Sequence, residues 1–163
     1  MDSLRQQFLV CLDMRVSIVA YRDHCSPEKE RLELQPFSRD VNESEAFLAQ
    51  LKAAGGGDAP EDVQGGLRLA LEQKWEAKTR YAVLLADAPC HGNKYHEPTI
   101  KDNYPDGDPN GSVIEDQMVK FAQLGVHFNV VKITPSTDIM FQIMDKYYQE
   151  GGSKRPIEIA ELG

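Results

Sequence analysis

The sequence predicts an α/β fold, a doubly wound, mostly parallel sheet with helices on both faces. Apolar runs rich in β-branched residues predict buried strands at 15–21, 81–86 and 126–133. Between and beyond them, apolar residues at helical spacing predict helices at 42–53, 60–75, 113–124 and 137–149. This alternation is typical of strand–helix–strand units, in which parallel strands are joined by helical crossovers.

The first elements follow from local patterns. Residues 8–12 are short and apolar, and predict either the end of a helix or a strand. Residues 15–21 predict a central strand because they include the β-branched residues Val16, Ile18 and Val19. Residues 32–37 alternate apolar and polar side chains and reach Pro36, which favours an edge strand.

The helix at 42–53 has Asn42 or Ser44 as its predicted cap. The next helix begins at Pro60, a residue favoured in a first helical turn. After the strand at 81–86, the loop at 88–111 is long enough to be functional or disordered.

The last elements complete one domain. Ser112 and Glu115 fit a capping box for the helix at 113–124, and Gly125 ends that helix. A strand and a final helix follow. We therefore expect a single domain over residues 1–152 and a loose tail over 153–163.

Composition agrees with one globular domain and argues against two classes of partner. The chain has 163 residues, 41% hydrophobic and 27% charged, with a formal net charge of −8. Nucleic acids and anionic membranes attract basic faces, and the sequence has no basic cluster. No apolar run is long enough to span a bilayer, and the N-terminus is not a signal peptide. Three cysteines do not make a disulfide framework, so we expect a cytoplasmic protein.

Two loops that carry carboxylates are the most informative functional feature. Asp58 follows three glycines at 55–57, with Glu61 and Asp62 in the first turn of the next helix. Asp87 is the first charge after the strand at 81–86, at the end where open α/β sheets collect ligands. Two such loops at one sheet edge predict a site for a hard cation with oxygen ligands. For Glu61 and Asp62 the simpler interpretation is that they complement the helix dipole.

Four motifs then follow one another at short spacing. They are RVSIVAYRDHC at 15–25, GGGDAPED at 55–62, ADAPCHG at 86–92 with Tyr95 and His96, and DNYPDGDP at 102–109. As a set, over roughly residues 14–150, they resemble the von Willebrand factor A-like domains of intracellular eukaryotic proteins, in particular those linked to atypical α-kinases.

This resemblance implies a doubly wound α/β domain that binds proteins, often through a metal-ion-dependent adhesion site. In the family, that site takes Asp-x-Ser-x-Ser from the first strand, a Thr or Asp from a middle loop, and an Asp from the end of the fourth strand. Asp58 matches the middle-loop position and Asp87 the last. The nearest match to the first motif begins at Asp13, the third candidate ligand, but Arg15 replaces its first serine.

Two accounts explain the incomplete start. In one, residues 3–12 end the first helix and the first strand is absent; in the other, Leu12 and Asp13 end the first strand and the first helix is lost. Both predict a truncated member, whose sheet has unpaired backbone groups or a direct pairing of the flanking strands at its middle. Because few protein oxygens remain, we expect only weak binding of Mg²⁺ or Mn²⁺.

The resemblance also predicts one protein-binding face, formed by the loops at 22–26, 55–62 and 87–111. The candidate contact residues on these loops are Asp23, His24, Gly57, Asp62, His91, His96 and Asp106. Cys90, His91 and His96 are also zinc-ligand types, but their spacing is not that of a structural zinc site. The alternative is that these side chains bond to the loop backbone and pack against the turn at 21–25.

The sequence does not predict an enzyme. It has no phosphate-binding loop, nucleophile elbow, dinucleotide fingerprint or kinase signature. The alternative function is a regulatory or metal-dependent enzymatic part of an α-kinase-type protein serine/threonine kinase, using Asp87, His91 and His96. Any kinase activity would then need a domain that these 163 residues do not contain.

Overall fold

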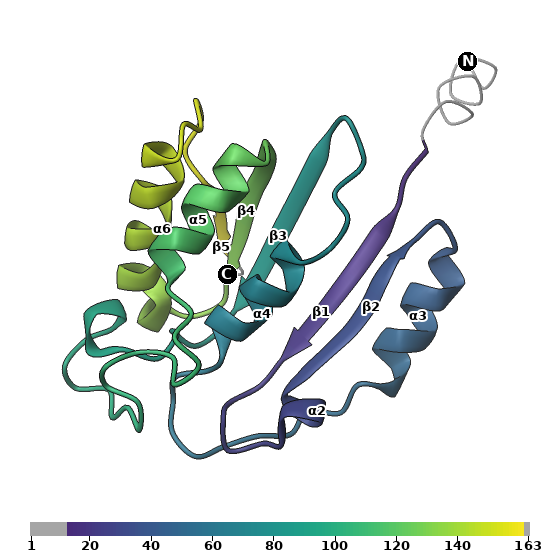
Figure 1. Ribbon diagram of the computed structural model, residues 1–163. Helices are drawn as coiled ribbons and strands as arrows, with labels where there is room; N and C mark the ends of the chain where they lie inside the picture. Colours follow the sequence, from purple (N-terminus) through teal and green to yellow (C-terminus); the bar gives the residue numbers. More distant parts are fainter. Residues whose placement is uncertain (1–12, 162–163) are drawn as a thin grey trace.

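The computed structural model describes residues 13–161, which form an α/β fold (Figure 1). Strands β1 (Val16–Tyr21) and β2 (Leu32–Ser38) pair in an antiparallel sheet. Strands β3 (Arg80–Ala86), β4 (Val126–Lys132) and β5 (Glu158–Glu161) pair side by side in a parallel sheet. The predicted α/β class is confirmed. The apolar segment at 8–12 lies outside the described residues.

Five α-helices and two 3₁₀ turns connect the described strands. They are α2 (Glu28–Arg31), α3 (Val41–Gln50), α4 (Val63–Leu71), η1 (Asn93–Tyr95), α5 (Ile114–Gln123), η2 (Pro135–Thr137) and α6 (Asp138–Glu150). The cap of α3 is Asp40, whose side chain accepts a hydrogen bond from the backbone N–H of Asn42, so neither Asn42 nor Ser44 is the cap. Helix α4 begins three residues after Pro60 because Asp62 caps it, accepting from the N–H of Gly65 at 2.7 Å.

The predicted capping box at α5 does not form. The Ser112 N–H donates to Asp108, and the Glu115 carboxylate instead binds Lys94 Nζ and Tyr95 Oη, each at 2.6 Å. A long-range contact with the preceding loop therefore outcompetes the local cap. Gly125, at φ +64°, does end this helix as predicted.

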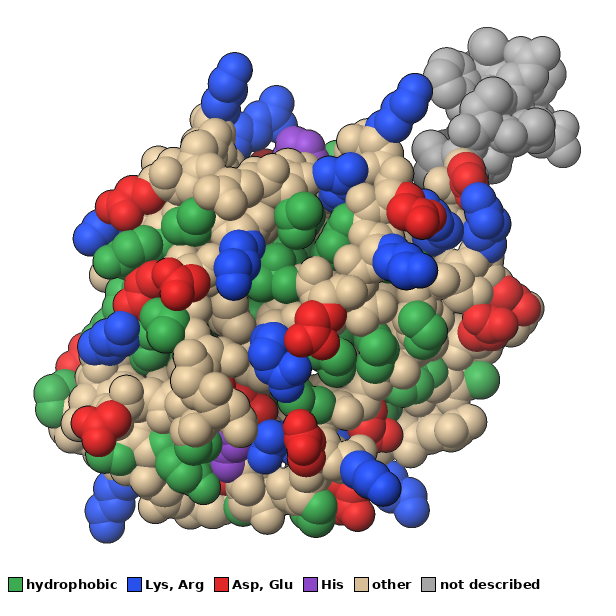
Figure 2. Space-filling view, viewed as in Figure 1, with side chains coloured by type: hydrophobic (Ala, Val, Ile, Leu, Met, Phe, Trp, Pro, Cys, Tyr) green, Lys and Arg blue, Asp and Glu red, His purple; other side chains and the backbone are tan. Residues whose placement is uncertain are grey.

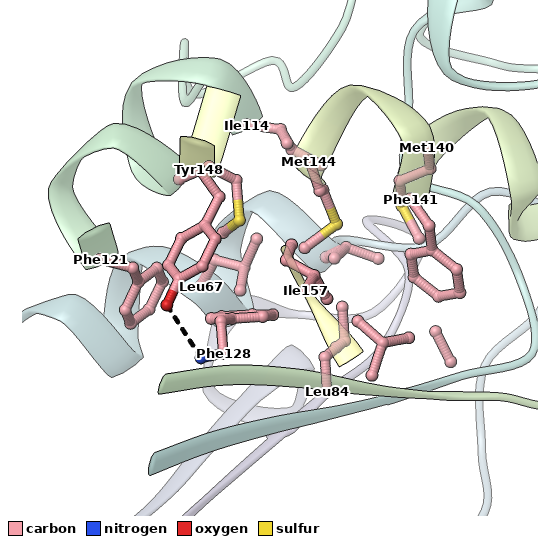
Figure 3. Packing of buried hydrophobic residues seen from close by; sticks show 14 of the residues in the cluster. Leu67, Leu84, Ile114, Phe121, Phe128, Met140, Phe141, Met144, Tyr148 and Ile157 are labelled. Carbon is pink, nitrogen blue, oxygen red and sulfur yellow. Dashed lines mark hydrogen bonds between the residues drawn. The ribbon is translucent and has the colours of Figure 1, made fainter. Parts of the chain in front are cut away.

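The main core lies between the parallel sheet and α4, α5 and α6 (Figure 3). Inward residues of β4, including Phe128, meet Phe121 of α5 and Met144 of α6. The Tyr148 hydroxyl donates to Val126 O at 2.6 Å and accepts from the Phe128 N–H at 3.3 Å. This pairing satisfies a buried hydroxyl and ties α6 to β4.

The opposite face of β3 is open to solvent. Tyr81, Val83 and Leu85 alternate with buried residues along the strand and are 64%, 56% and 58% exposed. Helices therefore cover one face of the parallel sheet in the described part of the chain. On the side drawn in Figure 2, acidic, basic and hydrophobic side chains are intermixed. No helix within residues 13–161 is long and apolar enough to cross a membrane.

In the part of the chain that the structure describes, the two sheets do not join into one. Among residues 13–161, β1 pairs with β2 alone and β3 pairs with β4 alone, so one edge of each strand has no ladder partner. Of the two outcomes predicted for an incomplete first strand, the described residues therefore show unpaired edges.

The segment after Ser153 was expected to be loose, but part of it is an ordered strand. Residues 158–161 form β5, paired with β4 from Asn129 to Lys132. Ile157 is 6% exposed and packs in the core, which draws this short segment onto the sheet.

Candidate functional site

Three loops meet at the C-terminal ends of β1 and β3, and we call this edge the rim. The loops are residues 22–27, 51–62 and 87–113. The Glu61 N–H donates to Pro89 O at 2.9 Å, and the Asn103 N–H donates to Asp58 Oδ2 at 2.6 Å. His91 Nε2 lies 3.0 Å from Asp23 Oδ1. Each loop is thus tied to another by hydrogen bonds, as the sequence predicted when it placed all three at one sheet edge.

Asp102 organises the longest of the three loops. Its Oδ1 lies 2.8 Å from His91 Nδ1 and accepts from the Tyr104 N–H at 2.7 Å. Its Oδ2 accepts from the Gly92 N–H at 2.6 Å and lies 3.1 Å from His96 Nε2. Burial alone would raise the pKa of Asp102, but these four partners outweigh it and lower the pKa to about 2. Asp102 is therefore an ionised hub that holds both histidines.

Asp23, Asp58 and His91 form the first candidate ligand group. Each offers one ligand atom, and these atoms lie within 4.8 Å of one another. Asp58 Oδ1 is buried and has no hydrogen-bond partner within residues 13–161. A buried carboxylate oxygen without a partner costs free energy, which a cation at that position would recover.

The contacts of His91 also favour a cation in this group. Both of its ring nitrogens face carboxylates, Nδ1 that of Asp102 and Nε2 that of Asp23. A neutral imidazole has one N–H, so one nitrogen would present a lone pair to an acceptor. A cation between His91 Nε2 and the Asp23 carboxylate would use that lone pair. An Asp102–His91 pair behind a ligating nitrogen is the usual support of a metal-bound histidine.

His24, Asp62 and Asp108 form a second candidate group, but Arg31 already supplies it with a cation. Arg31 Nε lies 2.8 Å from Asp62 Oδ2, and His24 Nε2 lies 3.2 Å from Asp108 Oδ1. Burial lowers the pKa of His24, so the permanent positive charge of this group is that of Arg31. We interpret this group as a structural contact that holds the loop at 22–27 against the loop at 87–113.

Glu61 lies on the side of the rim that faces the open edges of β1 and β3. With Asp87, it lines a cavity of about 290 Å³ that is also lined by Tyr21, Arg22 and Leu85. Burial, with Asp23, Asp87 and Asp58 nearby, raises the pKa of Glu61 to about 7. Its Oε2 is buried without a hydrogen-bond partner in the described chain.

The predicted metal ligands are not all brought together. Asp58 joins the first group, whereas Asp87 is exposed, belongs to neither group and lines the cavity. Asp13 lies before the start of β1, at the opposite end of the strand from the rim. There it makes a two-bond ion pair with Arg39, at 2.7 and 2.8 Å. This separation excludes Asp13 from a site that contains Asp58.

The predicted contact residues divide by exposure. Asp23, His24, Asp62, His91 and His96 have buried side chains, so they shape the rim from inside. Asp106 is exposed. Gly57 has φ +133°, and a Cβ there would lie 2.6 Å from Asp23 Oδ2, so both conformation and space require glycine.

Cys90 does not join a zinc-type group. Its side chain is buried and free, and burial raises the pKa of its thiol well above the ordinary value. His91 and His96 both turn to Asp102, and the His91 ring packs 5.2 Å from that of His24. The alternative predicted for these side chains, contact with the turn at 21–25, is confirmed for His91.

Sequence reasoning missed two residues of the rim. The motif that contains Asp102 predicts no role for this residue by itself, although a carboxylate in a loop with two histidines is a signal for their partner. The simpler interpretation of Glu61, that it complements a helix dipole, does not account for its side chain, which lines the cavity near other carboxylates. No pattern in the sequence distinguishes Glu61 from Asp62, which does cap the helix.

No family model matches the chain. A search of characterised proteins finds similarity to a segment of a longer protein, the alpha-protein kinase vwkA of Dictyostelium discoideum. The two are 36% identical over 141 residues, which are 85% of this chain and 22% of that protein. The chain thus spans about a fifth of the length of this relative, and it is related to part of an α-protein kinase.

Proposed function

We propose that this chain is a protein-interaction module of the von Willebrand factor A-like type, which binds a partner through its rim and a partial metal-ion-dependent adhesion site. The ligand group Asp23, Asp58 and His91 carries the proposal, because its three ligand atoms lie within 4.8 Å and Asp58 Oδ1 has no partner in the described chain. Similarity to a segment of an α-protein kinase supports a role as an accessory module.

The ligand set fits a divalent cation of intermediate softness. Two carboxylates suit Mg²⁺, Ca²⁺ and Mn²⁺, whereas an imidazole favours transition metals. We therefore propose that the site prefers Mn²⁺ to Mg²⁺ and binds both weakly, because water must supply the remaining ligands. When bound, such an ion accepts a carboxylate of a partner as a further ligand.

The chain's own residues position the group. Asp102 fixes the His91 ring through Nδ1, the Asn103 N–H holds Asp58 through Oδ2, and Gly57 allows its loop to approach Asp23. The free Asp58 Oδ1 is thereby directed to the group. Asp87 and Glu61 add negative charge beside it.

Thermal unfolding of the full chain tests the metal part of the proposal. A cation that binds only the native state raises the unfolding midpoint, by about 1.4 kcal/mol of stability when present at tenfold its Kd. We expect Mn²⁺ to raise the midpoint by about 3 to 5 °C, and Mg²⁺ by less. Asp58→Asn should abolish the shift, and Asp87→Asn should reduce it.

Asp106→Asn is the matched control, since Asp106 is an exposed carboxylate of the same rim outside both ligand groups. If Asp106→Asn lost the metal response as fully as Asp58→Asn, the cation would be responding to the net charge of the rim. That result, or no shift with either metal, would contradict the proposed site.

The second candidate function is regulation of an α-kinase within a longer polypeptide, favoured by the similarity to vwkA. Its test is the kinase activity of that longer protein with Asp58→Asn and with Asp106→Asn in this segment. A regulatory role predicts that only Asp58→Asn changes the activity or its dependence on Mn²⁺.

A further inference from the structure

A cavity separates the two sheets, and its walls are strand edges. It is lined by four successive residues of β1 and the turn after it, Val19 to Arg22, and by Leu85 and Asp87 on the β3 side. Side chains of successive strand residues point to opposite faces, so a wall made of successive residues is the backbone edge itself. In the described chain these edges of β1 and β3 have no ladder partner.

The two edges that face each other belong to strands that run in the same direction. β1 and β3 both run toward the rim, where Asp23 and His91 from the following loops meet (Figure 1). The Tyr21 hydroxyl crosses the cavity and donates to Leu85 O at 3.0 Å, satisfying a carbonyl that the ladder leaves open. A strand parallel to both neighbours would supply such partners along the whole length of the gap.

The rim end of the cavity has a defined charge. Glu61 and Asp87 line it, and Glu61 Oε2 is buried without a partner among residues 13–161. Arg22 also lines it, but its guanidinium is bound to Glu33 and to the carbonyls of Glu30 and Lys52. The C-terminal end of an inserted parallel strand would therefore meet acidic side chains.

We propose that the cavity between β1 and β3 accepts an extended apolar segment of another polypeptide, as a strand parallel to both, with a basic residue at its C-terminal end opposite Glu61 and Asp87. The main chain supplies affinity by completing both ladders, and the basic residue sets direction and register. The exposed apolar face of β3 next to the cavity (Tyr81, Val83 and Leu85) would be continued by side chains of the new strand.

The probe is a fluorescein-labelled peptide, Thr-Val-Val-Ile-Val-Thr-Lys, added to the full chain in the presence of EDTA so that metal binding plays no part. Fluorescence anisotropy should show saturable binding. Replacing the central Ile of the peptide with Pro, or its Lys with Glu, should weaken binding at least tenfold, because proline removes a ladder donor and Glu faces two carboxylates. Equal binding of all three peptides would overturn the proposal.

A pair of matched variants locates the peptide. Leu85 is 58% exposed and lines the cavity, whereas Leu48 is 54% exposed and lies on α3. Leu85→Arg should weaken binding at least tenfold and Leu48→Arg should leave it unchanged. Because both side chains are exposed, neither substitution disturbs the core. Equal effects of the two variants would show that the peptide binds elsewhere.

Hydrogen exchange separates this groove from the other strand edges. The peptide should slow amide exchange in β1 and β3 and leave β5 unaffected. Protection of β5 or β2 instead would mean addition to an outer edge, and would refute the groove. A concentration-dependent dimer that protects β1 and β3 without peptide would make a second copy the occupant, and would also refute the proposal. If the metal response were absent but the peptide still bound, the proposed metal site would be contradicted and the proposed strand-binding groove would be supported.

Discussion

Glu61→Gln tests the electrostatics of the rim most directly. The substitution keeps the shape of the side chain and removes its charge. Burial, with Asp23, Asp87 and Asp58 nearby, raises the pKa of Glu61 from 4.5 to about 7. The folded protein therefore binds the Glu61 proton more tightly than the unfolded chain does, and ionising this carboxyl costs stability.

The sign and size of the effect follow from this pKa. A carboxyl whose folded pKa is raised destabilises the fold as the pH rises from 4.5 through about 7, and the full cost is reached above that range. At 1.36 kcal/mol per pKa unit the cost would be about 3.4 kcal/mol. Because the side chain is only partly buried, solvent screening reduces this, and we expect about 2 kcal/mol. Below about pH 4.5 the cost vanishes, since both states are protonated.

The assay is urea unfolding of the full chain and of Glu61→Gln in EDTA, at about pH 4 and about pH 8. The variant should be about 2 kcal/mol more stable than the natural chain at the higher pH and nearly equal at the lower one. Glu72→Gln, an exposed glutamate at the end of α4, is the control and should have no effect at either pH. A Glu61→Gln gain that is absent at about pH 8, or the same at both values, would refute the assignment of an uncompensated carboxylate to the cavity.

Three further predictions concern the scaffold. Asp102→Asn should cost about 3 to 5 kcal/mol in urea unfolding, because it leaves two buried histidines and two N–H groups with an imperfect acceptor. Since the folded pKa of Asp102 is about 2, the stability that this carboxylate contributes is present above about pH 4 and is lost as the pH falls toward 2. The variant should therefore lose less stability than the natural chain over this pH range. An equal loss in both proteins would contradict the role of Asp102 as an ionised hub. Gly57→Ala should lower the melting midpoint and weaken Mn²⁺ binding, whereas Gly111→Ala, also at positive φ but with open space, should lower the midpoint alone. Phe128→Ala should cost about 3 to 5 kcal/mol by opening a cavity in the core, and a loss below about 1 kcal/mol would show that the packing between β4 and α5 is not as described.

The fold was predictable where a local pattern decides it. Apolar runs located β1, β3 and β4 to within a residue or two, and apolar residues at helical spacing located α4, α5 and α6. The misplaced details are those that depend on distant contacts. The short β5 forms because Ile157 packs in the core and β4 offers a free edge, and neither fact is visible in the sequence of the segment.

The sequence predicted where in the fold the site lies, but it did not predict which side chains contact one another there. The rule that ligand loops gather at the carboxyl ends of strands correctly placed three loops at one edge. It gave no information on which carboxylate is paired inside the protein. Asp62 and Asp58 are four residues apart, yet Arg31 neutralises the first, whereas Oδ1 of the second has no hydrogen-bond partner in the described chain. That difference arises from α2, which brings Arg31 to Asp62.

The balance of charge across the rim explains why two binding proposals converge on one side of it. On the side of α2, the carboxylates of Asp62 and Asp108 are matched by Arg31, His24 and backbone N–H donors. On the side of the cavity, the carboxylates of Asp23 and Asp58 each accept one backbone N–H and share His91, whose other ring nitrogen faces Asp102. Glu61 Oε2 has no hydrogen-bond partner in the described chain and Asp87 lies nearby, so carboxylates are in excess there. Such an excess is unfavourable in the free protein, and the raised pKa of Glu61 measures it. A cation at Asp58 and a basic residue at the end of an inserted strand would each relieve part of it. The destabilised region is therefore where binding can contribute most to the stability of the fold.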